Sequence, residues 1–256
     1  MTGLLAYEDS RGSGTPVVLV HAFPFDRRMW RRQQESLARH DVRTIAVDLA
    51  GFGDSRTMVR HSVDQHADDL VRVLDHVGAT NAIVVGLSMG GYVAMAFARR
   101  HPERLAGLLL ADTRSSGDTD DAKQGRAANI ERARREGSVA VFDAMTKAWP
   151  SAPDPAHVAE MRAIASDQSA EGVIAALEMM RDRPDATPRL AEIRVPASII
   201  VGREDELTPP PLAEIMARAI PGATLHVLEG AGHFTNVERP AEFDAVLLNL
   251  VHRNSD

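Results

Sequence analysis

Short apolar runs recur along the chain and alternate with longer stretches in which apolar and polar residues mix. The runs are rich in valine, isoleucine and leucine on both faces, which is typical of parallel strands covered on both sides. They predict strands at residues 17–20, 44–47, 82–85, 105–111, 197–201 and 225–228. This alternation indicates an α/β fold, with a mostly parallel sheet and helices on both of its faces.

Two of the mixed stretches have the spacing of amphipathic helices that pack on such a sheet. Apolar residues recur at helical spacing over residues 70–77 and again over residues 243–251. Ser62 and Gln65 match a capping box before the first stretch, and Gly78 is a suitable stop after it. Pro240 suits the first turn of the second helix.

About 80 residues break this alternation after the strand that ends near Ala111. They contain no convincing strand, and prolines divide them into predicted helices around residues 122–136, 139–149, 156–166 and 170–181. A helical insertion at one point of a parallel sheet should lie over the strand ends. We therefore expect an α/β core of residues 1–112 and 194–256, with a helical cap of residues 113–193.

Ser88 lies where a predicted strand meets a predicted helix. The sequence GLSMGG at residues 86–91 is a G-x-S-x-G motif in the strand–turn–helix context that the motif requires. Glycine fits beside the serine because larger side chains would clash with the neighbouring strand and helix. The pattern predicts a nucleophile at a helix N-terminus, where developing negative charge is favoured. A plain strand-to-helix turn is the alternative interpretation.

A serine nucleophile needs a base, and the chain offers one after its last predicted strand. His233 lies there in a glycine-rich loop, and Asp205 follows the preceding strand. The order Ser88, Asp205, His233 fits a serine hydrolase on a doubly wound sheet. Asp112 follows the strand after the elbow and is the rival acid. We prefer Asp205, in which case Asp112 would serve to anchor the cap.

Two backbone N–H groups are expected to stabilise an oxyanion. Met89 directly follows the nucleophile, and Phe23 lies in the loop after the first predicted strand. Pro24 has no N–H and is excluded.

Composition removes several other classes of function. The net charge of −7 offers no basic field for nucleic acid or an anionic membrane. The absence of cysteine excludes a thiolate nucleophile and cysteine-ligated metals. His61 and His66 are poorly spaced for a helical metal pair, so we expect no metal and no other cofactor. The N-terminus does not resemble a signal peptide, and no apolar run could span a bilayer. We therefore expect a cytoplasmic protein.

The chain resembles α/β-hydrolase fold proteins over essentially its whole length. Besides the Ser88 elbow, the matching landmarks are HAFP at residues 21–24, DLAGFGDS at 48–55, Asp205 ahead of TP at 208–209, and GH at 232–233. Within this fold the chain is similar to bacterial 3-oxoadipate enol-lactonases, cofactor-free haloperoxidases (perhydrolases) and small carboxylesterases. The resemblance implies a triad of Ser88, Asp205 and His233, with Phe23 and Met89 at the oxyanion hole.

The expected activity is hydrolysis of a small carboxylic ester or lactone through an acyl-enzyme on Ser88. A perhydrolase that uses hydrogen peroxide and a ligand binder with little turnover remain as alternatives. One position departs from the family, which usually has glycine where this chain has Ala22. The added methyl group would narrow the pocket or shift the Phe23 N–H, without removing this donor.

The predicted cap contains the candidates for substrate contacts. Met145 and Trp149 are apolar residues that could line a pocket. The alternative is that such residues bury against neighbouring helices. A group of arginines could bind a substrate carboxylate, as a lactonase for a dicarboxylic acid would need, or could form a solvated helix face. These are Arg126, Arg132, Arg134 and Arg135, with Arg181 and Arg183 at the end of the cap. The oligomeric state is left open.

Overall fold

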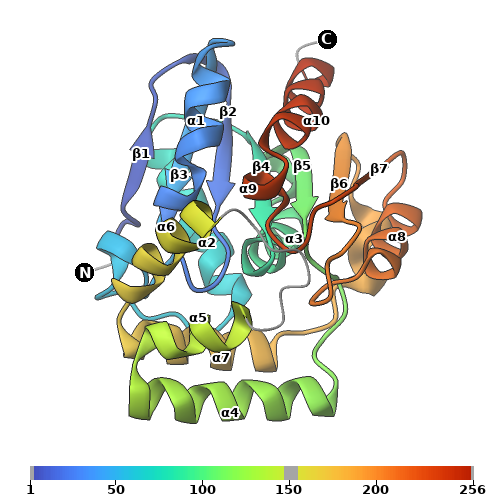
Figure 1. The fold of residues 1–256 in the computed structure, drawn as a ribbon. Coiled ribbons are helices and arrows are strands. Elements are labelled where there is room, and N and C mark those ends of the chain that lie inside the picture. The colour runs from blue at the N-terminus through green and yellow to red at the C-terminus, as the bar shows by residue number, and fades with distance from the viewer. Residues whose placement is uncertain (1–2, 147–154, 255–256) are drawn as a thin grey trace.

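A seven-stranded sheet forms the centre of the computed structural model, which describes residues 3–146 and 155–254 (Figure 1). The strand order is β1-β3-β2-β4-β5-β6-β7, and every neighbouring pair is parallel except β1 with β3. The six predicted strands are confirmed, and β1 is an addition that the sequence did not predict. The strands are β1 (Tyr7–Asp9), β2 (Ser13–Val20), β3 (Val42–Val47), β4 (Ala82–Leu87), β5 (Leu105–Ala111), β6 (Ala197–Gly202) and β7 (Thr224–Leu228).

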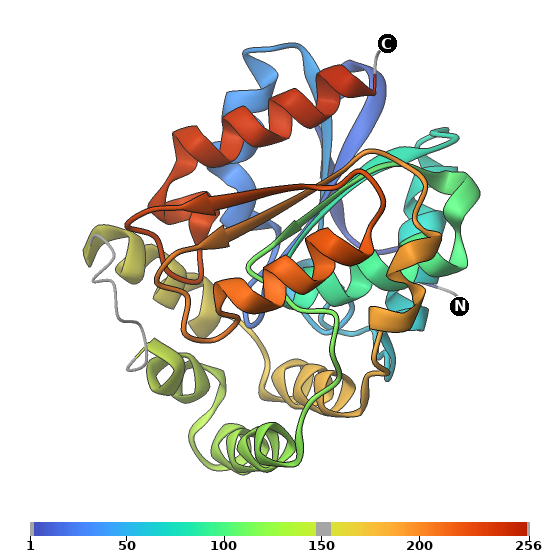
Figure 2. The same ribbon diagram turned by 90° about the vertical axis from the view of Figure 1, so that its right-hand side faces the viewer.

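Helices cover both faces of the sheet, because alternate strand residues point to opposite sides (Figure 2). Val17 and Leu19 of β2 join the apolar cluster under α1 and α10, whereas Val18 and Val20 join the cluster under α2, α3 and α8. The covering helices are α1 (Arg31–Ala38) and α10 (Pro240–Arg253) on one face, and α2 (Val63–His76), α3 (Met89–Arg100) and α8 (Pro210–Ala219) on the other.

Helix α2 begins and ends where the sequence predicts. The Ser62 hydroxyl accepts a hydrogen bond from the N–H of Gln65 at 3.3 Å. The Gln65 side chain in turn accepts one from the N–H of His61 at 2.7 Å. Gly78 lies just beyond the helix with φ of +69°, a left-handed conformation that suits glycine and ends the helix.

The chain between β5 and β6, which we call the cap segment, contains four α-helices in the part that the structure describes. Helices α4, α5 and α7 of this segment lie beneath the carboxyl ends of the central strands (Figure 1). The part of the segment that the structure describes contains no strand, as predicted. Its division from the core as a separate domain stays a prediction. The helices are α4 (Asp120–Glu136), α5 (Ser138–Thr146), α6 (Pro155–Ser166) and α7 (Ala170–Asp182).

Short helical turns lie in the connections between the main helices and strands. They are the helix α9 (Thr235–Glu238) and 3₁₀ turns at Arg27–Trp30, Gly53–Ser55, Pro102–Arg104 and Thr187–Glu192.

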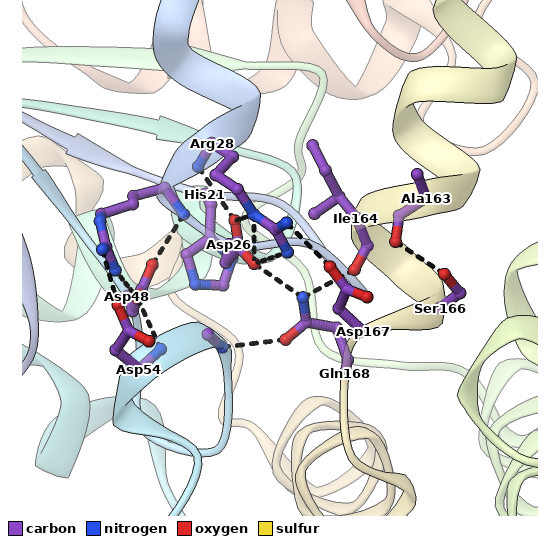
Figure 3. Close-up of polar contacts among 12 residues, drawn as sticks. His21, Asp26, Arg28, Asp48, Asp54, Ala163, Ile164, Ser166, Asp167 and Gln168 are labelled. Atoms are coloured by element: carbon purple, nitrogen blue, oxygen red, sulfur yellow. Dashed lines mark hydrogen bonds and ion pairs between the residues drawn. The ribbon is translucent and has the colours of Figure 1, made fainter.

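A polar network joins the connection between α6 and α7 to two loops of the core (Figure 3). The Gln168 amide donates to the Asp26 carboxylate at 2.8 Å and accepts from the N–H of Gly53 at 2.9 Å. Arg28 bridges Asp26 at 2.7 Å and Asp167 at 2.8 Å. Asp26 is buried, so these partners offset the cost of removing its carboxylate from water. The network holds the cap segment against the loops that follow β2 and β3.

Candidate active site

Ser88 occupies a tight turn between β4 and α3. Its φ of +53° and ψ of −112° are unfavourable for a residue with a side chain. Hydrogen bonds hold this backbone from both sides. The Ser88 N–H donates to the Ala111 carbonyl at 2.9 Å, and the Ser88 carbonyl accepts from Thr113 Oγ1 at 2.8 Å and from the Gly91 N–H at 2.9 Å. The turn therefore presents the Ser88 side chain to the cavity described below.

The residues two positions before and two positions after Ser88 must be glycine, because other backbone segments pass very close to them. A methyl group on Gly86 would lie 2.3 Å from the carbonyl oxygen of Gly90. A methyl group on Gly90 would lie 2.2 Å from the carbonyl oxygen of Val20 in the neighbouring strand. These distances are shorter than any van der Waals contact, so the clash expected from the sequence is confirmed.

Loops after three different strands bring Ser88, His233 and Asp205 together. His233 Nε2 lies 2.9 Å from Ser88 Oγ, and His233 Nδ1 lies 2.9 Å from Asp205 Oδ2. The second carboxylate oxygen of Asp205 accepts from the N–H groups of Leu207 and Thr208, each at 2.9 Å. The Thr208 hydroxyl donates to Asp205 Oδ2 at 2.7 Å. With Nδ1 donating to this fixed carboxylate, Nε2 is left to accept the Ser88 proton.

The electrostatics of the pair favour an ionised Asp205 and a basic His233. Burial lowers the pKa of His233, but the charge of Asp205 and their hydrogen bond outweigh it, and the pKa lies above its usual value. Burial acts to raise the pKa of Asp205. The charge of His233 and hydrogen bonds from His233 and Thr208 outweigh this effect, so the pKa lies below its usual value.

Asp112, the rival acid, is fully buried near Asp205 and His233 but bonds elsewhere. One carboxylate oxygen accepts from the Gly202 N–H at 3.1 Å, and the other accepts from the N–H and hydroxyl of Thr235 at 3.0 and 2.6 Å. Within the described residues it makes no hydrogen bond with His233. Asp112 thus anchors the end of β6 and the turn after His233, and the expectation that it anchors the cap is wrong. Burial, reinforced by the charge of Asp205, raises its pKa well above the usual value.

The loop after β2 places Phe23 at the cavity. His21 Nε2 accepts from the Leu49 N–H, and His21 Nδ1 donates to the Ala22 carbonyl, both at 2.9 Å. Burial lowers the pKa of His21, consistent with the neutral ring that these two bonds require. The Ala22 methyl packs in the core and does not line the cavity, so the expected narrowing is not observed. The oxyanion roles of Phe23 and Met89 stay a prediction.

A cavity of about 280 Å³ opens at Ser88 and His233, between the core loops and the cap segment. Met145 lines it, whereas Trp149, the other substrate-contact candidate, falls outside the described residues. Several of the lining residues had no recognisable motif in the sequence, notably Tyr92, Arg114 and Leu177. The described lining residues are Phe23, Ser88, Tyr92, Arg114, Ala122, Gly125, Arg126, Asn129, Met145, Leu177, Met180, Leu207, Thr208 and His233.

The arginines of the predicted cap lie in different surroundings. Arg126 of α4 lines the cavity. On the same helix, Arg134 pairs with Glu131 and Arg135 with Glu136 at the surface. Carboxylate binding therefore stays a prediction for Arg126, whereas Arg134 and Arg135 belong to a solvated helix face.

In residues 3–146 and 155–254, no three or more His, Asp or Glu side chains form a group that could hold a metal ion. His66, weighed above as a metal ligand, is buried, and this burial lowers its pKa to about 3. Over the same residues, no helix has both the length and the apolar character needed to cross a bilayer.

The alpha/beta hydrolase family model matches residues 17–246 of the chain. The chain belongs to the alpha/beta hydrolase family. A thermophilic esterase from Thermogutta terrifontis, solved with malate bound, is 39% identical with a TM-score of 0.92, over 98% of this chain and 93% of its own. The 3-oxoadipate enol-lactonase 2 of Acinetobacter baylyi is 29% identical over 88% of this chain and 84% of its own. These likenesses confirm the predicted fold and the predicted group of relatives.

A bromoperoxidase from Bacillus anthracis has the same fold. It is 24% identical with a TM-score of 0.86, over 97% of this chain and 95% of its own. At this level of identity the likeness concerns the fold alone.

Proposed function

We propose that this hydrolase cleaves carboxylic esters or lactones of small molecules through an acyl-enzyme on Ser88. The observation that carries the proposal is the continuous series of hydrogen bonds from Ser88 Oγ through His233 to Asp205, which opens onto a cavity. A ligand binder would have no use for a serine, an imidazole and a carboxylate in this alignment. The esterase and enol-lactonase relatives support an ester or lactone as the substrate.

The first half-reaction forms the acyl-enzyme. His233 Nε2 removes the proton from Ser88 Oγ as this oxygen attacks the carbonyl carbon of the substrate. Asp205 holds the ring by its Nδ1–H and stabilises the imidazolium that results. The tetrahedral intermediate then collapses, the bond to the leaving oxygen breaks, and His233 returns the proton to that oxygen.

The second half-reaction repeats this sequence with water. His233 removes a proton from a water molecule, whose oxygen attacks the acyl carbon. The bond to Ser88 Oγ breaks and His233 returns the proton to Oγ, so the free acid leaves and the protein is regenerated. His233 therefore acts as base and then acid in both halves.

The negative oxygen of both tetrahedral intermediates needs donors close to Ser88. We assign this role to the backbone N–H groups of Met89 at the start of α3 and of Phe23 at the cavity wall. Each donor is worth roughly 3 kcal/mol of transition-state stabilisation. The N-terminal end of α3 adds a favourable dipole.

A rapid release of 4-nitrophenol from 4-nitrophenyl acetate tests the proposed function. We expect a burst near one equivalent per protein molecule, followed by steady turnover, because acylation expels the phenolate before water attacks. Protein treated beforehand with a fluorophosphonate is the control and should show neither phase. Release that stops below one equivalent, or that never exceeds the rate in buffer, would contradict the proposal.

The size of the cavity predicts a preference for short acyl chains. Its volume of about 280 Å³ is at the low end for ligand pockets, so a long acyl chain would extend into solvent. We expect kcat/KM for 4-nitrophenyl acetate and butyrate to exceed that for the laurate and palmitate by about tenfold or more. The measurement is a series of initial rates below the aggregation limit of each ester. Faster cleavage of the long chains, or activation at an oil–water interface, would refute this expectation.

A further inference from the structure

The cavity at Ser88 is lined by positively charged side chains that have no role in the proposed mechanism. Two arginines line it, Arg114 after β5 and Arg126 on α4, and no Asp or Glu is among the lining residues that the structure describes. Their side chains are 18% and 21% exposed, so the guanidinium groups are partly desolvated and still accessible. In such surroundings a positive charge attracts an anion far more strongly than it does in bulk water.

One carboxylate behind the cavity wall compensates only part of this charge. The side chain of Asp118 is fully buried and pairs with Arg114, with Arg126 at 3.1 Å and with Arg183 at 2.6 Å. Three guanidinium groups thus share one carboxylate, and the cluster keeps a net charge of +2. Arg114 and Arg126 are partly removed from water, so a further anionic partner at the cavity would be favourable.

Arg183 makes its polar contacts within the protein, although its buried Nε, like that of Arg114, has no partner among the described residues. Arg183 is buried, donates to the carbonyl groups of Ser116 at 2.8 Å and Met180 at 2.5 Å, and lies 4.0 Å over the ring of Tyr92. These contacts give Arg183 a structural role. The excess charge that faces the cavity therefore belongs to Arg114 and Arg126.

Both of these arginines retain unused hydrogen-bond donors. The Nε of Arg114 is buried and has no partner within the described residues. Arg126 donates to Asp118 from Nε, and over residues 3–146 and 155–254 no acceptor is found for its two terminal nitrogens. A buried donor without a partner is costly, so a ligand that supplied acceptor oxygens at this wall would be favoured.

We propose that the substrate is an ester or lactone that also carries a carboxylate, and that Arg114 and Arg126 bind this carboxylate while the scissile carbonyl lies at Ser88. The proposal rests on the proposed function and names the substrate class for it. A planar carboxylate accepts two parallel N–H···O bonds from a guanidinium group, and it is small enough for a cavity of this volume. The two arginines line the cavity and take no part in proton transfer.

Matched substrates test the proposal. The mono-4-nitrophenyl esters of glutaric and adipic acid end in a carboxylate where 4-nitrophenyl pentanoate and hexanoate end in a methyl group. Since a charge-assisted hydrogen bond contributes about 10- to 100-fold in binding, we expect the wild type to cleave at least one anionic ester with a kcat/KM about tenfold or more above that of its neutral match. The preference should weaken as salt is added.

Substitutions of the arginines test whether Arg114 and Arg126 cause the preference for anionic esters. Arg114→Met and Arg126→Met each leave Asp118 with two arginine partners, so the fold should be kept, and circular dichroism checks this. We expect each variant to lower the ratio of anionic to neutral kcat/KM by about 10-fold or more, mainly through the KM of the anionic ester. Arg134→Met is the matched control, because Arg134 lies on α4 and does not line the cavity.

The outcomes separate the two proposals. If the wild type cleaves no ester, the proposed function itself fails. If the wild type cleaves neutral and anionic esters with equal kcat/KM, the ester hydrolase stands and the carboxylate site is overturned. The same conclusion follows if the arginine variants lower kcat/KM equally for both kinds of ester. Restoration of the ratio by Arg126→Lys, with the ratio of the Arg134→Met control unchanged, would support a site that recognises charge.

Discussion

Replacement of Ser88 by alanine is expected to lower kcat for 4-nitrophenyl acetate by about 10⁴- to 10⁶-fold. The loss follows because no other hydroxyl is bonded to His233 Nε2 among the described residues. Residual activity should come from transition-state binding by the remaining donors. The variant should also lose covalent labelling by a fluorophosphonate probe, which can be measured by mass spectrometry of the intact protein.

The fold should tolerate this change, because the Ser88 backbone bonds to Ala111, Thr113 and Gly91 do not involve its hydroxyl. Thermal unfolding of the variant is the control. A folded Ser88→Ala protein that still labels at wild-type stoichiometry would show that another residue is the nucleophile.

The second large effect is expected from Asp205→Asn, with a loss of about 10⁴-fold in kcat. An asparagine amide facing His233 Nδ1 would favour the wrong tautomer, leaving Nε2 protonated and unable to accept the Ser88 proton. The pH profile should change as well. The charge of Asp205 raises the pKa of His233. Protonated His233 cannot act as a base, so wild-type kcat/KM should fall as the pH is lowered, with a midpoint above 6.5. Without that charge the pKa falls, and the midpoint of the variant should move to lower pH.

Asp112→Asn is the matched control for the same chemistry at a neighbouring buried carboxylate. Its bonds go to Gly202 and Thr235, so we expect less than a tenfold loss in kcat. The amide would leave a buried donor at Thr235 or Gly202 unpaired, at a cost of about 1–3 kcal/mol in the free energy of unfolding. Urea denaturation with activity assays on both variants distinguishes the roles. A folded Asp112→Asn protein that is the less active of the two would reverse the assignment.

Strand β1 shows where the sequence pattern carries too little information. Tyr7–Asp9 is three residues long, and two of them are acidic. It pairs along one edge with β3, and none of its residues is fully buried. Its position depends on an available edge of β3, and its own residues therefore show no apolar pattern to predict it.

Helix α1 could not be predicted from the sequence either, for a different reason. Its buried residues are Gln33, Ser36 and Leu37, so it has no apolar stripe. Gln33 instead donates to the carbonyl of Asn236 at 2.9 Å. Gln33 and Asn236 are so distant in the chain that their contact depends on the assembled fold and leaves no local pattern in the sequence.

The three triad candidates could be predicted because each follows a strand and lies in a recognisable local motif. The cavity wall could not, because it depends on which face of α4 is turned toward the core. Only Ile130 and Ala133 of α4 are buried, so the sequence does not define that face. This is why Arg126 could not be separated from Arg134 and Arg135 before the structure was known.

The cap segment leaves the core and returns to it at nearly the same point. The hydroxyl oxygens of Ser115 and Thr187 lie 2.7 Å apart, and the Ala186 N–H donates to the Ser115 carbonyl at 2.9 Å. Helices of another length or sequence could therefore be grafted between these two residues without displacing β5 or β6. One wall of the cavity can thus diverge among descendants of this chain while the opposite wall, with Ser88 and His233, is inherited unaltered.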